Sequence, residues 1–267
     1  ATKKQQTTET MTPPLPQIGL QLWTIREAIN QDLPASLAAI AKMGYRGIET
    51  AFWPDGVSLQ EGAKALQDAG LSVFSIHCEL PLDTQKEELF LEMSETYQCD
   101  TLVWHGWPED PRYASMEGLQ AIKAEFVQAS EFAQKHGKQL GLHNHWWEFR
   151  TMEGGQQTAF EFLLERLPEE IFFELDTYWI KVAGQDPAKM VAKWGSRAPF
   201  LHVKDGPAVQ DKAMTAVGDG VQDFPKMLDQ QDHIQWLIVE IDECDTDMMQ
   251  AVARSADYLN STGLGRF

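Results

Sequence analysis

Short apolar runs alternate with longer amphipathic segments along most of the chain. The runs are rich in β-branched and aromatic residues, recur about every 30 residues, and have the length of buried strands. We predict strands at Ile18–Trp23, Gly47–Ala51, Ser72–His77, Thr101–His105, Gln139–His145, Ile171–Leu175, Phe200–Lys204 and Trp236–Ile241. A strand followed by a loop and a helix has this period.

The segments between these runs carry apolar residues at the i, i+3 and i+4 spacing of helices. Several end at a glycine, the residue that most easily takes the left-handed conformation after a helix; Gly44, Gly70 and Gly137 are examples. The predicted helices lie within residues 32–44, 58–70, 84–98, 115–137, 158–168, 186–195, 224–230 and 245–263.

Eight such repeats without a break in composition predict a single (β/α)8 TIM barrel over residues 17–267. The competing fold is a doubly wound open sheet, which usually carries a glycine-rich phosphate-binding turn after its first strand. The sequence after Ile18–Trp23 has no such turn. Residues 1–16 are polar and rich in proline, so we predict a flexible leader there.

Composition narrows the possible partners. The 267 residues carry a formal net charge of -18, which repels a phosphodiester backbone, so we expect no nucleic acid partner. The sequence has no apolar stretch long enough to span a membrane. Three cysteines do not form a disulfide framework, and we predict a cytoplasmic protein, with export after removal of a signal peptide as the alternative. A homo-oligomer is compatible with this sequence.

Candidate chemistry gathers at the carboxyl ends of the predicted strands, where a barrel of this kind builds its active site. Five of the seven histidines fall at these ends. Residues two apart on a strand share a face, which pairs His143 with His145, Glu174 with Asp176, His202 with Lys204, and Glu240 with Asp242. Imidazoles and carboxylates that converge from several strands suit one divalent ion, Mn²⁺, Mg²⁺, Co²⁺ or Zn²⁺. A lone histidine at a strand end is more often structural, so the hypothesis depends on the whole set.

These stretches, taken together, resemble the sugar phosphate isomerase/epimerase group of xylose isomerase-like TIM barrels, which is related to endonuclease IV. The resemblance runs in order through nearly the whole chain. It is carried by "GLQLWTIREAI", "MGYRGIE", "GLHNHWWEF", "LDTYWIKVAGQDP", "LHVKDG", "VGDGVQDF" and "IVEIDE".

The resemblance implies one divalent metal ion held by residues of the last four strands. By position, Asp176, His202 and Glu240 match three ligands. Many members have a glutamate at the end of the fifth strand, where this chain has His143; we expect Glu148 to be the fourth ligand, with His143 as the alternative. Trp179 stands where ketose epimerases of the group often have a histidine, which departs from that subgroup.

We therefore hypothesise a metal-dependent isomerase or epimerase that acts on a small-molecule sugar or sugar derivative by proton transfer through an enediolate. His145 is the candidate base, Lys204 the candidate acid, and Glu148 a further catalytic candidate. Substrate contacts are assigned to Glu49, His77, His105, His143, Trp107 and Trp179.

Three alternatives stay open. A dehydratase or lyase acting on a keto-sugar or keto-polyol would use the same metal site and then expel a group. An abasic-site endonuclease is disfavoured by the negative charge. A non-catalytic sugar-binding protein would keep the barrel without turnover.

Overall fold

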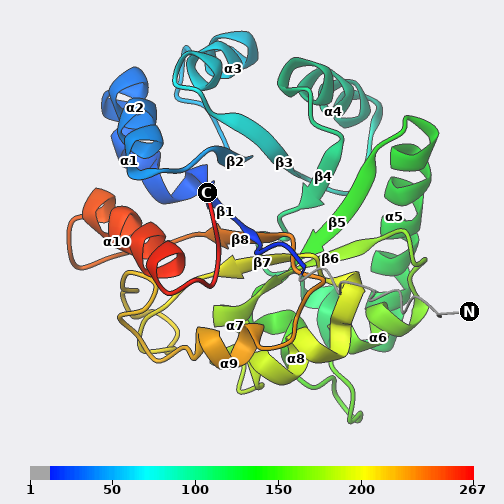
Figure 1. Cartoon of the computed structure of the whole chain (residues 1–267). Coiled ribbons are helices and arrows are strands. Elements are labelled where there is room, and N and C mark those ends of the chain that lie inside the picture. The colour runs from blue at the N-terminus through cyan, green and yellow to red at the C-terminus, as the bar shows by residue number, and fades with distance from the viewer. Residues whose placement is uncertain (1–12) are drawn as a thin grey trace, which may run out of the picture.

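The computed structural model describes residues 13–267, so residues 1–12 of the predicted leader lie outside the described part. Eight parallel strands close into a barrel in sequence order, and β8 pairs with β1 (Figure 1). The strands are β1 Gln17–Gln21, β2 Gly47–Thr50, β3 Ser72–Cys78, β4 Thr101–Trp104, β5 Gln139–His143, β6 Phe172–Asp176, β7 Phe200–Val203 and β8 Trp236–Val239. The predicted single-domain (β/α)8 barrel is confirmed.

Helices surround the strands in Figure 1 and connect each strand to the next. They are α1 Arg26–Gln31, α2 Leu33–Met43, α3 Leu59–Asp68, α4 Thr84–Tyr97, α5 Met116–Lys135, α6 Ala159–Arg166, α7 Thr177–Val182, α8 Pro187–Trp194, α9 Phe224–Leu228 and α10 Met248–Ser261. In residues 13–267, none of them has the length and apolar content that crossing a membrane requires.

Local sequence sets where these helices begin and end. The Ser58 side chain accepts a hydrogen bond from the backbone of Glu61, whose carboxylate accepts one from the Ser58 backbone, and this capping box begins α3. After α2, Gly44 takes a left-handed conformation with φ of 113°, as its place after the apolar pattern predicts.

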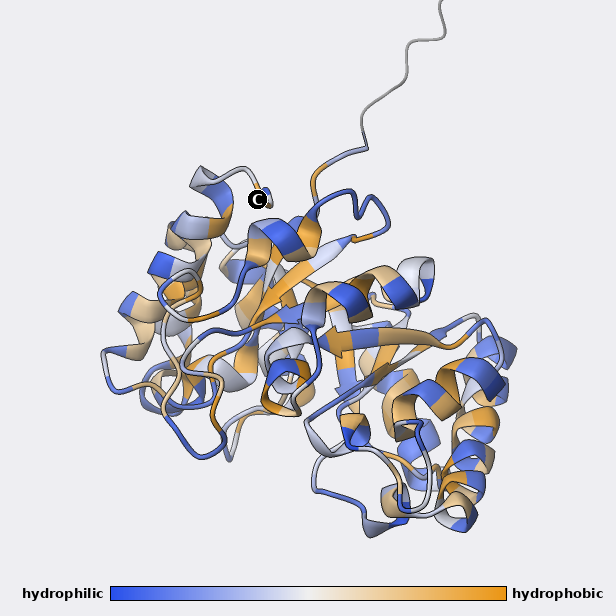
Figure 2. Ribbon diagram, turned by 90° about the horizontal axis from the view of Figure 1, so that it is seen from below, coloured by the Kyte–Doolittle hydropathy of each residue, from blue (hydrophilic) through white to orange (hydrophobic). Residues whose placement is uncertain are grey.

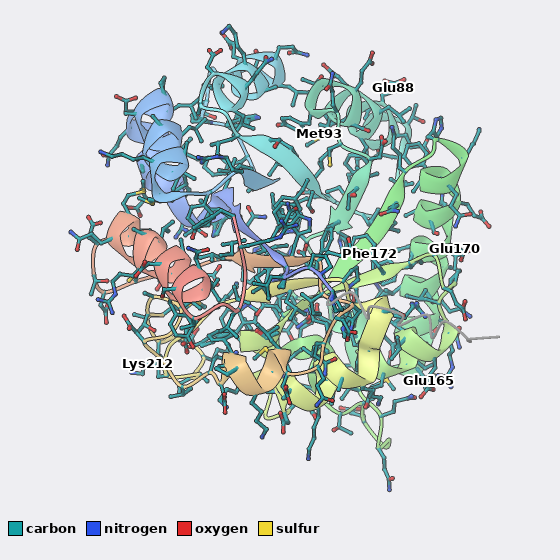
Figure 3. The ribbon with its side chains drawn as sticks, viewed as in Figure 1. Glu88, Met93, Glu165, Glu170, Phe172 and Lys212 are labelled. Carbon is teal, nitrogen blue, oxygen red and sulfur yellow. The ribbon has the colours of Figure 1, made fainter. Side chains whose placement is uncertain are left out.

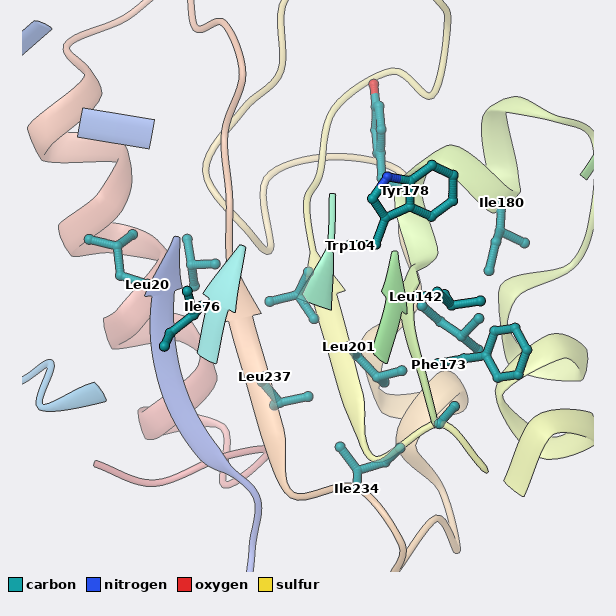
Figure 4. Close-up of a cluster of buried hydrophobic side chains, with 14 of the residues drawn as sticks. Leu20, Ile76, Trp104, Leu142, Phe173, Tyr178, Ile180, Leu201, Ile234 and Leu237 are labelled. Atoms are coloured by element: carbon teal, nitrogen blue, oxygen red, sulfur yellow. The ribbon is translucent and has the colours of Figure 1, made fainter. Parts of the chain in front are cut away.

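Alternation along the strands separates two environments. Leu20, Ile76, Leu142, Leu201 and Leu237 are buried beside the strands, in the layer that the helices cover (Figure 4). Hydropathy colouring shows apolar strands inside and mixed helices around them (Figure 2). The polar strand-end residues alternate with these leucines and so face the barrel interior.

Charged residues of the helices and loops around the barrel lie on the outside of the molecule, away from the barrel interior. Glu88, Glu165, Glu170 and Lys212 are exposed at the periphery, whereas Phe172 starts β6 and lies near the centre of the view (Figure 3). Much of the excess negative charge is thus solvated on the outside, apart from the carboxylates that enter the barrel.

Three predicted strands, β1, β5 and β8, end two residues earlier than expected. β1 stops at Gln21 because its side chain accepts a hydrogen bond from Trp23 N, which starts a 3-10 turn at Leu22–Ile25. β5 stops at His143, and Trp147–Phe149 form another 3-10 turn. The short helices α1 and α7 were not predicted, since six residues carry too little periodicity to stand out.

Aromatic rings fill the amino-terminal end of the barrel. Phe74 of β3 stacks on Trp236 of β8, with ring centroids 3.7 Å apart and an angle of 5° between the planes. Gly47 lies against these rings, and a Cβ there would run into Trp236 and Phe74. A small residue at this position is therefore a packing requirement.

We expect Gly47→Ala to destabilise the protein by about 1–3 kcal/mol, because an added methyl group overpacks the stacked rings. Urea unfolding followed by circular dichroism measures the change. Gly155→Ala is the matched control, since a Cβ at this exposed position meets no atom closer than 3.7 Å. Equal stability of Gly47→Ala and the control would show that the packing is not tight.

Candidate metal centre

Strand register brings the polar residues to one end of the barrel. Gln21 pairs with Glu49, and Glu49 pairs with Ser75 across the first three strands. On the opposite side, His143 pairs with Glu174, and Asp176 pairs with His202. Residues far apart in sequence therefore meet inside one ring of strands.

Within residues 13–267, two groups of side chains place their ligand atoms within 4.8 Å of one another. The outer group comprises His143, Asp176, His202 and Glu240, and the inner group comprises Glu49, His77, Glu174 and His202. His202 belongs to both groups and is fully buried. Its Nδ1 atom faces Glu240 Oε2 at 2.7 Å, and its Nε2 atom faces Glu49 Oε1 at 2.6 Å.

His143 is oriented for metal binding. Its Nδ1 lies 3.0 Å from the backbone carbonyl of His105, which only accepts hydrogen bonds, so Nδ1 carries a hydrogen. In the neutral ring the lone pair is then on Nε2, 3.2 Å from Asp176 Oδ2. A ligand histidine usually donates its other N–H in this way.

Asp176 divides its two carboxylate oxygens between two tasks. Oδ1 accepts a hydrogen bond from Trp179 N at 3.0 Å and caps the start of α7. Oδ2 faces His143 and lies 3.8 Å from His202 Nδ1. One residue thus ends β6, begins a helix and supplies its second oxygen to the outer group.

Lys204 adds a positive charge to this region. Its Nζ lies 2.7 Å from Asp242 Oδ2, 2.9 Å from Glu240 Oε2 and 3.2 Å from Asp176 Oδ2. Burial disfavours the ammonium, but these three carboxylates raise the pKa of Lys204 well above its ordinary value. Burial alone would raise the pKa of Asp176, but Lys204 and the neighbouring histidines hold it below its ordinary value.

Glu148 lies beside this group and is absent from both sets of converging ligand atoms. Its Oε2 accepts a hydrogen bond from His145 N at 2.8 Å, and Oε1 lies 3.7 Å from His145 Nδ1. Burial raises the pKa of Glu148 well above its ordinary value, which favours a neutral carboxyl group. The arrangement supports His143 over Glu148 as the ligand from the β5 end.

His145 is held in its neutral form. Burial, with His143 and Lys204 nearby, lowers the pKa of His145 well below its ordinary value, so the ring is neutral. The ring stacks on Trp147 with centroids 4.3 Å apart, and Nδ1 is buried without a hydrogen-bond partner in the described residues. A neutral, oriented imidazole can accept a proton.

Three of the other predicted substrate residues, His105, Trp107 and Trp179, lie toward the rim. His105 follows β4, and its Nδ1 accepts a hydrogen bond from Trp107 N at 3.0 Å. Burial, with the nearby His77, lowers the pKa of His105 to about 4. Trp107 is 60% exposed, with its ring centroid 5.7 Å from that of His145, and Trp179 lies below the Lys204 ammonium at 5.1 Å. Glu49 and His77 lie deeper, in the inner group.

Sequence reasoning did not single out two polar residues that organise the site. Asn144 accepts a hydrogen bond from Asp176 N at 2.8 Å and donates to Asp176 O, which joins the ends of β5 and β6. Ser75 donates to Glu49 Oε2 at 2.6 Å. Ser75 precedes His77 by two residues and shares its face, which was the available signal for its position.

The chain matches the family described as xylose isomerase-like TIM barrel over residues 37–262, and it belongs to that family. A sugar phosphate isomerase/epimerase from Parabacteroides distasonis is similar in structure, with a TM-score of 0.78 and 23% identity over 97% of this chain and 98% of that one. At 23% identity, this similarity shows a shared fold and nothing more.

Two further solved structures share the fold. A probable 3-DHS dehydratase from Bacillus anthracis has a TM-score of 0.71 and 13% identity, covering 91% of this chain and 98% of its own. A 3-keto-D-glucoside 4-epimerase from E. coli has a TM-score of 0.65 and 17% identity, covering 92% and 99%. No curated protein matches the chain in sequence.

We expect His143→Ala to weaken Mn²⁺ binding by on the order of 100-fold or more, since loss of an outer-shell partner alone typically weakens binding about 10–100-fold. Isothermal titration calorimetry measures the affinity. Glu148→Gln is the control, because it keeps the size of a side chain that lies outside both groups. If instead Glu148→Gln bound Mn²⁺ more weakly and His143→Ala bound it with unchanged affinity, Glu148 would be the ligand.

Metal affinity should also rise with pH. Although burial opposes it, Glu174, Glu49 and Glu240 raise the pKa of His202 well above its ordinary value, so the imidazole is protonated at neutral pH. Nδ1 must release a proton before it can bind a cation, so affinity should increase up to roughly tenfold for each pH unit below the folded pKa. Calorimetry in buffers of different ionisation enthalpy should detect the released proton; affinity independent of pH would contradict this.

Proposed function

We propose that the protein is a divalent-metal-dependent isomerase or epimerase that acts on a sugar or keto-sugar by moving a proton between carbon atoms or faces. The observation that carries the proposal is the convergence of His143, Asp176, His202 and Glu240 next to the neutral His145 and the charged Lys204. The similar folds of a sugar phosphate isomerase/epimerase and a 3-keto-D-glucoside 4-epimerase support it.

The donor set suits a divalent ion of the Mn²⁺, Co²⁺ or Zn²⁺ type, because two imidazoles and two carboxylates combine borderline and hard ligands; Mg²⁺ prefers oxygen. Such an ion supplies a Lewis acid that stabilises negative charge on substrate oxygens. His143 Nε2 lies 3.2 Å from Asp176 Oδ2, and this oxygen lies 3.2 Å from Lys204 Nζ, so both atoms face the outer group, which fits this role.

In the proposed reaction, His145 takes the proton from the carbon next to a carbonyl group. Its low pKa keeps the lone pair available, and the stack on Trp147 fixes the direction of the ring. Glu148 accepts from His145 N and so positions the backbone that carries the base. Glu148 is then a positioning residue.

Lys204 serves as the proton donor or as the partner of a developing oxyanion. The ammonium already neutralises three carboxylates, which argues against a phosphate group as its partner. We therefore favour an unphosphorylated sugar or keto-sugar. Trp107 and Trp179 border the mouth and offer aromatic faces to a sugar ring.

Proton exchange with solvent tests the proposal. The metal-loaded protein, incubated with ketohexoses and 3-keto-glucosides in D2O, should introduce deuterium next to the carbonyl group, as nuclear magnetic resonance and mass spectrometry detect. No uptake from any of these sugars would reject the proposal. A product lighter by one water would assign the dehydratase outcome, which shares the first step.

Lys204→Met should lower the exchange rate by about 10²–10⁴-fold, the usual contribution of a positioned acid or base. The variant should still bind Mn²⁺, because it loses a cation that competes for Asp176 and Glu240. Lys181→Met, in α7 but outside both groups, is the control and should keep the wild-type rate. Equal rates for the two variants would remove Lys204 from the chemistry.

A further inference from the structure

The inner group alternates imidazole nitrogens and carboxylate oxygens in a closed ring. His202 Nε2 lies 2.6 Å from Glu49 Oε1 and 2.8 Å from Glu174 Oε1. His77 Nε2 lies 2.9 Å and 3.0 Å from the same two oxygens. Either a second cation or hydrogen atoms on the imidazoles could hold this ring together.

Gln21 decides between these two possibilities. Trp23 N donates to Gln21 Oε1 at 3.0 Å, so the amide oxygen points away from the ring and the amide nitrogen points toward it. Gln21 Nε2 donates to Glu49 Oε1 at 2.9 Å, and it lies 3.1 Å from His77 Nδ1. An amide nitrogen only donates, so a neutral His77 accepts at Nδ1 and carries its hydrogen on Nε2, and a protonated ring carries a hydrogen on Nε2 as well.

A nitrogen that carries a hydrogen has no lone pair for a metal ion. His77 Nε2 therefore donates to Glu49 and Glu174, whose ionised oxygens only accept. The same two oxygens face His202 Nε2, which places a hydrogen there as well. With a hydrogen fixed on Nε2, Nδ1 is the nitrogen that loses its proton when a metal ion binds, and it faces Glu240 of the outer group.

We propose that the inner group is a hydrogen-bonded cradle that fixes the tautomer of His202, so that the protein binds one metal ion instead of two. Glu49, Glu174, His77 and Gln21 are positioning residues in this account. It replaces the expectation that Glu49 and His77 contact substrate hydroxyls. The inference rests on the metal site of the proposed function.

The supports of the cradle are built into the first strands. Ser75 donates to Glu49 Oε2, while Gln21 and His202 occupy Oε1, so both oxygens of a fully buried carboxylate are satisfied. Carboxylate partners of ligand histidines fix ring orientation and raise ligand basicity. Three strands that carry no outer ligand thereby act on the metal site through one imidazole.

Zn²⁺-loaded protein labelled with ¹⁵N-histidine provides a direct test. Metal analysis should give one ion per chain, and long-range ¹H–¹⁵N spectra should show both His77 and His202 with hydrogen on Nε2. Two ions per chain, or a metal-bound Nε2 in His77, would overturn the cradle and leave the proposed function standing. Zero ions would reject the shared metal site itself.

Substitutions of the cradle carboxylates test whether these residues act on the metal site. Glu174→Gln and Glu49→Gln should each weaken Mn²⁺ binding about 10–100-fold while the near-ultraviolet circular dichroism stays native. Glu79→Gln is the matched control: it removes one carboxylate at the mouth, 68% exposed and 3.8 Å from His105, and should leave the affinity unchanged. Unchanged affinity in both cradle variants would overturn the inference.

Discussion

Charge compensation among buried carboxylates is the constraint on which the centre of this barrel depends. Glu49, Glu174 and Asp176 are fully buried, and Glu240 is nearly so. Ions removed from water are strongly destabilising unless opposite charges and hydrogen bonds replace the lost solvation. Lys204 and the imidazoles provide that replacement, so each carboxylate is held in a defined position before any ligand arrives.

The same constraint gives the outer group and the inner group different roles. His202 connects them, because one ring nitrogen faces the outer group and the other faces Glu49 and Glu174. The ligand atoms of the outer residues converge on one another, while in the inner group Glu49 has hydrogen-bond partners at both carboxylate oxygens. The apolar outer faces of the strands pack under the helices and keep both layers at fixed register.

Much of the barrel could be predicted from sequence because its signals are local. Strand alternation placed Asp176, His202 and Glu240 at strand ends, and closure of the barrel brought them together as predicted. The relation between His143 and Glu148 could not be predicted in this way. It depends on where β5 ends and on the 3-10 turn that follows, and short turns leave little periodic pattern. The assignment of ligands stays a prediction.

The roles of Gln21 and Ser75 were also beyond a reading of one sequence, because each depends on a hydrogen bond to a neighbouring strand. The register between strands that are far apart in sequence is set by the packing of the whole barrel, so it cannot be inferred directly from one sequence. Polar residues inside predicted strands were the only available indication.

The most direct test of the central claim is an anomalous difference map from crystals of the Mn²⁺-loaded protein. The account predicts one peak in the barrel, within coordination distance of His143 Nε2, Asp176 Oδ2, His202 Nδ1 and Glu240 Oε2. A peak between His77 and Glu49, or one bound by Glu148 instead of His143, would contradict it.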